Sequence, residues 1–221
     1  MYFGLSEDQI FFQDNVKKFL EDQLPLETIK KITEGEDILA KEELHRSLIS
    51  LGINNILIPE KNGGLGLDLL FATAVSQSLG EGVATLPFLG PYIVAPTAIK
   101  YGASDNQKEK LFSNMSQNLM NFGIGFSEYF GSRDSSGLNI SDKKVTGKTL
   151  FVLDVDFATH VMVSDEEGQI GIVSLDSDGI EMIDLITVDK TRTFTEMHFV
   201  DTPIEVLDKT KSSSVAVEMA L

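Results

Sequence analysis

The sequence predicts an α+β fold: an N-terminal helical bundle, then an antiparallel β-barrel domain, then the start of a C-terminal helical domain. Three observations predict it. Apolar residues recur with the 3.6-residue period of a helix over the first 120 residues. From Phe122 the period falls to two, in short runs rich in Val, Ile, Phe and Thr. A polar stretch after Pro203 leads into a helical pattern over residues 212–221. We therefore expect domains at residues 1–120, 121–209 and 210–221.

The helical region opens with a capping box. Ser6 is followed three residues later by Gln9, an amphipathic run comes next, and Pro25 lies beyond its end. Further helical patterns cover residues 39–51, 69–79, 91–101 and 106–115. Ser104 is a candidate cap for the last of these. The short connections between the patterns are typical of a helical bundle.

The connection at residues 51–67 is the most turn-rich part of the helical region. Gly52 follows a helical pattern as a C-terminal cap would, and Pro59 ends any regular element. Three further glycines leave the backbone free to take positive φ angles: Gly63, Gly64 and Gly66. We expect a structural loop that joins two helices and takes no part in chemistry.

Six runs with a period of two predict strands. They cover residues 122–127, 144–153, 157–164, 170–175, 180–187 and 195–200. Turn signals separate them at Gly137, at Asp142 and within residues 166–168 and 176–179. This spacing is typical of an antiparallel barrel or sandwich.

The composition argues against several classes of protein. The chain of 221 residues carries a formal net charge of −16, and its Lys and Arg residues form no block longer than a pair. Such a surface repels phosphate backbones and anionic lipids, so we expect neither nucleic acid nor a membrane as a partner. No apolar run approaches the ~18 residues that a membrane helix needs, and the N-terminus lacks the pattern of a signal peptide. We therefore expect a cytoplasmic protein.

The metal-binding and nucleophilic side chains are few. There is no cysteine, so a disulfide framework, a thiolate metal site and a cysteine nucleophile are excluded. The three histidines, His45, His160 and His198, lie far apart in the sequence and show no spacing typical of metal ligands. We expect no metal site.

A series of short motifs, taken in order, resembles the acyl-CoA dehydrogenases. The chain reads L-S-E-D-Q at the first helix, I-P-E-K-N-G-G-L-G-L in the glycine-rich loop and then L-G-E-G and P-F-L-G-P. Y-G-A-S-D-N-Q-K-E-K-L-F opens the last predicted helix of the bundle, and T-R-T-F-T-E-M-H-F-V-D-T-P follows in the β region. Each motif is weak alone, but together they cover essentially the whole chain.

This resemblance implies FAD-dependent α,β-dehydrogenation of an acyl-CoA thioester. In such a reaction a carboxylate base removes the α-proton while the β-hydrogen leaves as hydride to the flavin. It also implies a homo- or hetero-oligomer that passes its electrons to an electron-transferring flavoprotein.

The resemblance also implies which residues bind the flavin. The family's first flavin motif resembles the segment from Phe126 through Ser127 to Asp134, where Ser127 takes the place of a threonine hydroxyl. Its second motif resembles residues 146–154, which makes Phe151, Val152 and Leu153 candidate cofactor contacts. Phe151 can cover the flavin as an aromatic plate.

The chain departs from these motifs in several places. Tyr129 replaces a proline, and Leu153 cannot donate the hydrogen bond of the family's threonine. Ser132 and Arg133 are the candidate substrate contacts, and a guanidinium there can pair with phosphate. The interval at residues 135–143 is predicted to be too short for the family's extra strand.

The family's catalytic base lies in a C-terminal helical domain, so we expect it beyond Leu221, and no residue here is assigned that role. The sequence accordingly reads as a fragment or as one portion of a split or heteromeric enzyme. Three hypotheses remain open: a flavin-dependent dehydrogenase, a non-catalytic subunit that completes a partner's site, and a binding module without turnover.

Overall fold

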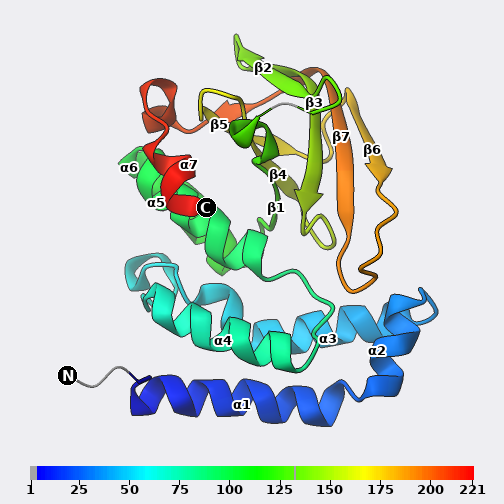
Figure 1. Ribbon diagram of the computed structural model, residues 1–221. Helices are drawn as coiled ribbons and strands as arrows, with labels where there is room; N and C mark the ends of the chain where they lie inside the picture. The colour runs from blue at the N-terminus through cyan, green and yellow to red at the C-terminus, as the bar shows by residue number, and fades with distance from the viewer. Residues whose placement is uncertain (1–3, 132) are drawn as a thin grey trace.

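The computed structural model describes residues 4–131 and 133–221 and places a layer of helices beside a large sheet (Figure 1). The helices are α1 (Glu7–Gln23), α2 (Leu26–Thr33), α3 (Ile38–Ser50), α4 (Leu69–Glu81), α5 (Ala95–Gly102), α6 (Asp105–Ser116) and α7 (Val215–Ala220). Shorter turns are the 3-10 helices η1 (Ile53–Asn55), η2 (Glu60–Asn62), η4 (Ser127–Phe130) and η5 (Asp208–Ser212), and the π-helical η3 (Gly90–Val94).

The predicted helices form, and their caps explain where two of them begin. At α1 the Gln9 amide donates to the Ser6 hydroxyl at 3.2 Å, while the Gln9 side chain accepts from the Ser6 amide at 2.8 Å. Helix α6 begins with the same box at Ser104 and Gln107. Helix α2 was not predicted, because its eight residues begin directly after Pro25 and are too few to display a helical period.

The glycine-rich loop is held together by its own backbone hydrogen bonds. The amide of Gly66 donates to the carbonyl of Ile58, and that of Leu67 to the carbonyl of Ile56, both at 2.8 Å. Gly64 is required by space, since a Cβ there would lie 2.0 Å from the Ile58 carbonyl oxygen. The loop is therefore a fixed structural unit.

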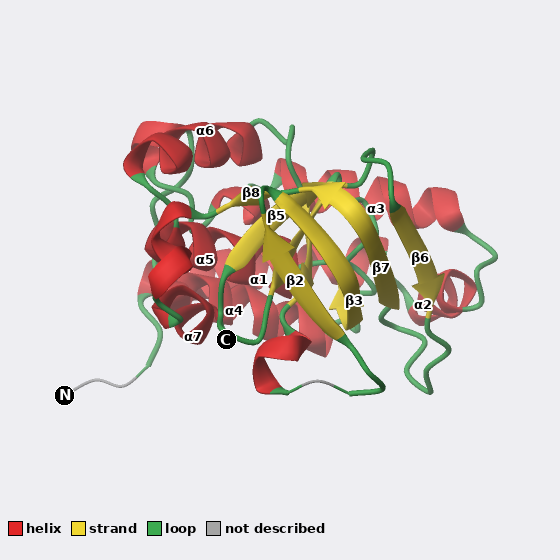
Figure 2. Cartoon of the chain, turned by 90° about the horizontal axis from the view of Figure 1, so that it is seen from above, coloured by secondary structure: helices red, strands yellow, loops and turns green. Residues whose placement is uncertain are grey.

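The described strands form one eight-stranded sheet. They are β1 (Phe122–Gly125), β2 (Gly137–Ser141), β3 (Lys144–Leu153), β4 (His160–Ser164), β5 (Ile170–Ser174), β6 (Ile180–Asp184), β7 (Phe194–Pro203) and β8 (Glu205–Val206). Their order is β6-β7-β3-β1-β4-β5-β8, with β2 paired to β3. Figure 2 shows the sheet twisting across this order.

Two predictions for the sheet are corrected. The antiparallel barrel is not confirmed, because the pairing runs from β6 to β8 without closing and β1 pairs with β4 in parallel. Strand β3 runs antiparallel to β1 and to β2, and β4 runs parallel to β1. Strands β2 and β4, which precede and follow β3 in the sequence, therefore run in the same direction. The extra strand predicted to be absent is present as β2, since Asp142 and Lys143, with φ angles of 49° and 59°, turn the chain in two residues.

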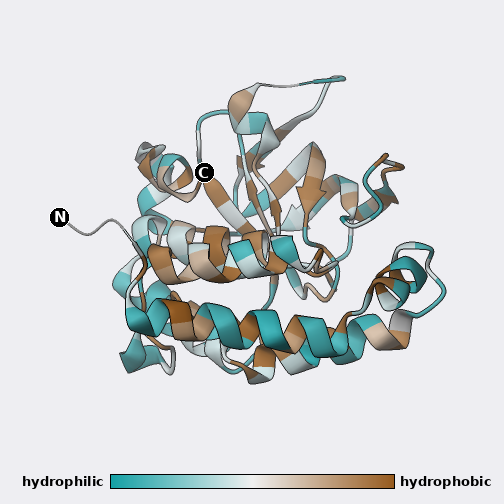
Figure 3. Cartoon of the chain, turned by 60° about the horizontal axis from the view of Figure 1, so that its bottom comes forward, coloured by the Kyte–Doolittle hydropathy of each residue, from teal (hydrophilic) through white to brown (hydrophobic). Residues whose placement is uncertain are grey.

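Three apolar clusters make up the core. One lies among α1, α3, α4 and the residues Phe88 and Tyr92, and Figure 3 shows hydrophobic residues recurring along the polar helix α1. A second joins α5, α6 and α7 to β1, β4 and β5, with Phe122 fully buried. The third lies between strands and includes Val145 and Phe199. The division at residue 120 stays a prediction, although α5 and α6 pack on the sheet.

Over the described residues, no helix combines the length and the apolar character required to cross a bilayer.

Candidate functional site

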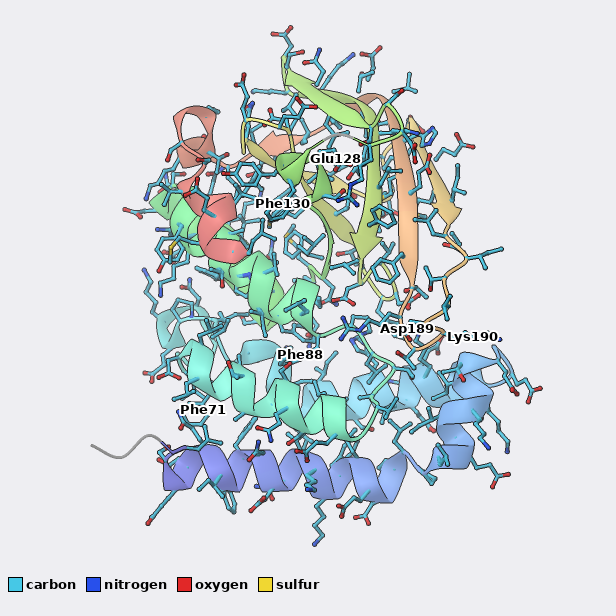
Figure 4. The ribbon with its side chains drawn as sticks, in the orientation of Figure 1. Phe71, Phe88, Glu128, Phe130, Asp189 and Lys190 are labelled. Atoms are coloured by element: carbon cyan, nitrogen blue, oxygen red, sulfur yellow. The ribbon has the colours of Figure 1, made fainter. Side chains whose placement is uncertain are left out.

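A small hollow lies where the segment after β1 meets β3. It has a volume of about 170 Å³ and is lined by residues of η4, the turn after it and β3: Ser127, Glu128, Phe130, Gly131, Arg133, Ser136, Leu150 and Phe151. Figure 4 shows Glu128 and Phe130 near each other beside the sheet. The hollow brings together both predicted flavin motifs, which lie more than 20 residues apart in sequence.

Ser127 begins η4 directly after β1. Its hydroxyl donates to the carbonyl oxygen of Leu150 at 2.6 Å and lies 3.0 Å from Oε1 of Glu128. A hydroxyl has one proton, so in this arrangement its donor is already used within the protein. It can serve a ligand only by rotating away from the Leu150 carbonyl.

Glu128 is 1% exposed, and its carboxylate faces into the protein. The Thr149 hydroxyl donates to Oε2, and the Leu150 amide donates to Oε1 at 2.9 Å. A buried carboxylate needs such donors, because an unpaired one would carry a large desolvation cost. Glu128 therefore fastens η4 to β3. The sequence does not reveal this role, since the direction of a side chain in a 3-10 turn has no periodic signal.

Phe151 stands out by its backbone. Its φ angle is 55°, and the pairing of β3 with β7 shifts register between Thr149 and Val152. A left-handed conformation is rare and costly for an aromatic residue. The shift is a bulge that turns the Phe151 ring outward, leaving it 43% exposed at the edge of the hollow.

The other predicted cofactor residues lie deeper. Phe126 is 3% exposed and belongs to the cluster under α5, and Val152 is fully buried in the cluster between strands. Leu153 is half-buried and pairs with Ile124 and Phe194. For Phe126 and Val152 the side chains are used in the core, so a ligand could meet only their backbone.

The two predicted substrate residues differ in outcome. Ser132 lies outside the described residues. Arg133 has an exposed side chain, and its backbone forms a tight turn with Ser136, whose amide donates to the Arg133 carbonyl at 2.7 Å. Phe130, which the sequence did not single out, is 70% exposed beside this turn. An aromatic residue next to Gly131 in a polar segment could have signalled it.

Tyr129 joins η4 to the last helix. Its hydroxyl donates to Oε1 of Glu218 at 2.9 Å, and the Ser214 hydroxyl donates to the same oxygen at 2.7 Å. These hydrogen bonds, the one from Ser214 first, lower the pKa of Glu218. The residue that replaces the family's proline is thus a structural contact.

Separate polar and ring contacts connect the sheet region to the helical layer. Oδ2 of Asp154 accepts from the Gly90 amide at 2.7 Å, and burial raises the pKa of Asp154. His45 lies 3.0 Å from the Tyr92 hydroxyl and stacks on Phe157 with ring centroids 4.3 Å apart. Burial, aided by the nearby Lys41 cation, lowers the pKa of His45 to about 4. Phe88 belongs to the apolar cluster among the helices, and Figure 4 shows it between α4 and α5.

Within the part of the chain that the structure describes, no group of three or more His, Cys, Asp or Glu side chains could hold a metal ion.

The residues at the hollow fit one side of a flavin. The exposed Phe151 ring offers an apolar plate, and Ser127 offers a hydroxyl that can exchange its partner. Leu153 adds no side-chain donor, and about 170 Å³ is below the range of about 300–1,000 Å³ that is usual for small-molecule sites. The hollow by itself is therefore smaller than a site that encloses a ligand of flavin size.

Comparison with known proteins gives two kinds of match. A sequence model described as the N-terminal domain of acyl-CoA dehydrogenase matches residues 6–118, about half of the chain. Among solved structures, glutaryl-coenzyme A dehydrogenase in complex with glutaryl-CoA superposes with a TM-score of 0.80 at 18% identity. That match covers 98% of this chain and 60% of the other.

Two further structures are similar. An acyl-CoA dehydrogenase from Geobacillus kaustophilus gives a TM-score of 0.79 at 19% identity, covering 100% of this chain and 63% of that one. An acyl-CoA dehydrogenase from Bacillus anthracis complexed with FAD gives 0.77 at 16% identity, covering 97% and 40%. The chain thus spans about 60% of the length of the first two relatives, and the likeness at these identities concerns the fold.

Proposed function

Because this chain belongs to the acyl-CoA dehydrogenase family, we propose that it is part of a flavoprotein that dehydrogenates an acyl-CoA thioester between Cα and Cβ. The observation that carries the proposal is the outward-facing Phe151 ring beside Ser127, at the point where the two flavin motifs meet. The proposal includes FAD as cofactor, a cytoplasmic oligomer and an electron-transferring flavoprotein as electron acceptor.

FAD, when bound, supplies the acceptor for the hydride that leaves Cβ. Phe151 would cover one face of the flavin ring and exclude water from it, and Ser127 would orient the ring through its hydroxyl. Arg133 is exposed and free to pair with a phosphate of the cofactor or substrate. Phe126, Val152 and Leu153 would contribute backbone contacts, and Ser132 remains a proposed substrate contact.

The base that removes the α-proton is proposed to lie outside residues 1–221. Glu128 is unsuited to the role, because both of its oxygens accept hydrogen bonds inside the protein. Glu218 accepts from Tyr129 and Ser214, which binds its carboxylate into a structural contact. A base must instead reach the substrate proton in a plausible pose.

The test is a titration of the purified chain with FAD, followed by the quenching of flavin fluorescence. We expect saturable binding that Phe151→Ala weakens by about tenfold, which is the size of one aromatic stacking contact. Phe11→Ala is the matched control, since Phe11 is 70% exposed on α1, away from the hollow. Saturable FAD binding that is equal in all three proteins would remove Phe151 from the proposal.

The second candidate is a non-catalytic subunit of a heteromeric acyl-CoA dehydrogenase. Ser127 already donates to Leu150, and Leu153 has no hydroxyl, so the chain offers few polar contacts to a flavin. A colourless protein that gains flavin and dehydrogenase activity only when a second chain is added would favour this candidate over the first.

A further inference from the structure

A second hollow lies on the glycine-rich loop, away from the candidate flavin site. Its volume is about 530 Å³, within the range of small-molecule sites, and it shares no lining residue with the hollow at Ser127. One wall comes from the loop and η2, the other from α5 and α6. Figure 1 shows these elements at the side of the molecule opposite β6.

Three lysines from three separate elements line this hollow: Lys61 of η2, Lys100 of α5 and Lys108 of α6. We call it the lysine pocket. In a chain with a formal net charge of −16, cations gathered in this way are unexpected. Glu60 is the carboxylate among the lining residues. Within the described residues, neither Lys61 nor Lys100 has an ion pair within 4.0 Å.

In the lysine pocket the lysine cations outnumber the one carboxylate among the lining residues, that of Glu60. Among the described residues, the ion pair of Lys108 is with Asp105 at 4.0 Å, and the Asp105 side chain is 97% exposed. The pKa of Lys108 lies below its ordinary value because the group is partly buried and because the Lys209 and Lys61 cations lie close to it. A bound anion would relieve this repulsion.

An unpartnered buried amide is the second feature. Asn62 is 6% exposed and lines the lysine pocket, yet its Oδ1 has no hydrogen-bond partner among the described residues. Because this oxygen is itself shielded from the hollow, the group of Asn62 that a ligand can use is the Nδ2 donor.

The walls of the lysine pocket are held in place. The Ser116 hydroxyl of α6 donates to the Asn62 carbonyl at 2.7 Å, which ties the two walls together. The Gly66 amide donates to the Ile58 carbonyl at 2.8 Å within the loop. A site formed before the ligand arrives loses less entropy on binding.

We propose that the lysine pocket binds a small phosphate ester that also carries an apolar or aromatic group. The ammonium groups of Lys61, Lys100 and Lys108 pair with the phosphate, and Asn62 hydrogen-bonds to it. Phe112 and Leu57 on the walls contact the apolar part. This proposal does not depend on the flavin site, and either can hold without the other.

The test uses the full chain, ADP as probe, and two-dimensional amide NMR. We expect saturable shifts at residues 57–67 and 108–112, weakened several-fold by physiological salt because charges in an open hollow are screened. Adenosine and inorganic phosphate, added separately, should each bind at least about tenfold more weakly than ADP, since each uses half of the site. ADP shifts confined to residues 127–136 and 150–151 would overturn the proposal, because they would report the flavin site.

The variant test removes two of the charges. Lys61→Gln combined with Lys108→Gln should raise the Kd for ADP by about tenfold or more. Lys18→Gln makes the same charge change on the exposed face of α1 and should alter the Kd by less than about twofold. Equal affinity in all three proteins, or no ADP shifts at millimolar concentration in the unmodified chain, would overturn the proposal. The shift map of the unmodified chain decides the matter even if the double variant does not fold.

Discussion

The helical region before β1 and the sheet region after it differ most in their backbones. Among described non-glycine residues, ten have positive φ angles, and only Val83 and Asn118 precede β1. The others are Asp134, Ser135, Asp142, Lys143, Phe151, Asp154, Phe157 and Asp201. Left-handed residues cost free energy and are kept where surrounding structure or function requires them. Strain is thus concentrated in the region that carries the candidate flavin site, and the helices follow local rules.

The two regions are nevertheless joined by partly buried contacts. Asp154, one of the left-handed residues, accepts a hydrogen bond from Gly90 at the start of η3. Lys41 of α3 pairs with Asp156 at 2.7 Å, and the two side chains are 21% and 35% exposed. The irregular backbone around Phe151 therefore also shapes how the sheet meets the helices.

The largest expected effect tests whether the regions unfold together. Phe122→Ala removes a fully buried ring from the cluster that α5, α6 and the strands share. We expect a loss of about 3–5 kcal/mol in the free energy of unfolding. Urea denaturation followed by circular dichroism measures it. Phe11→Ala, on an exposed site, should change stability by less than about 0.5 kcal/mol. Two separate transitions, with only one of them shifted, would show that the regions are independent.

The pH dependence of stability tests the contact between the helical region and the sheet region. The pKa of His45 is about 4 in the folded chain, against 6.5 ordinarily, so protonation favours the unfolded state. The contribution of this pKa shift to the free energy of unfolding is fully present above pH 6.5 and is lost as the pH falls toward 4. The loss is at most about 3 kcal/mol. Thermal denaturation across this range measures the loss. His45→Gln should show a smaller loss, and an unchanged pH dependence would remove His45 as its cause.

The glycine-rich loop offers a test in the helical region. Gly64→Ala places a Cβ against the Ile58 carbonyl and should cost about 1–3 kcal/mol or more, since the backbone must move. Gly80→Ala is the control: its Cβ would meet nothing within 4 Å, and Gly80 lies in α4. Alanine there should stabilise the helix by about 0.5–1 kcal/mol. Similar melting temperatures for the two variants would contradict the tight approach of Gly64.

The smallest expected effect tests whether the backbone at Phe151 is strained. Phe151→Ala and Phe151→Gly both remove the ring, but only glycine adopts the φ of 55° without cost. We expect the glycine variant to be more stable than the alanine variant by about 1 kcal/mol, although glycine normally loses more entropy on folding. Chemical denaturation of the pair measures the difference. An alanine variant of equal or greater stability would argue against a strained backbone.

Much of the fold could be predicted because its signals are local. Ser6 and Gln9 predicted the capping box of α1. The alternation over residues 144–153 predicted β3 from its first residue to its last. The turn at Asp142 was predicted, but strand β2 was missed because it is only five residues long and begins at Gly137, itself a turn signal. Strand order could not be read, since β1 pairs with β3 and β4 through contacts distant in sequence.

The candidate site was likewise predicted only in part. The resemblance of its motifs predicted that Ser127 and Phe151 contact the same cofactor, and both residues line one hollow. It did not indicate that Ser127 donates to Leu150, or that Glu128 turns inward. Those hydrogen bonds depend on where β3 lies relative to η4 once the sheet is packed. The lysine pocket was missed for the same reason, because its lysines come from separate elements.

The sequence by itself determined most of the helices and strands, though not α2, β2 or β8, and it determined which family the chain resembles. These follow from periodicity, caps and turn residues, whose physics is local. Only the tertiary structure decided that the sheet stays open, that Phe151 faces outward at a bulge and that three lysines share one hollow. Each of these depends on packing between distant segments, where burial and space select one arrangement from many that the local rules permit.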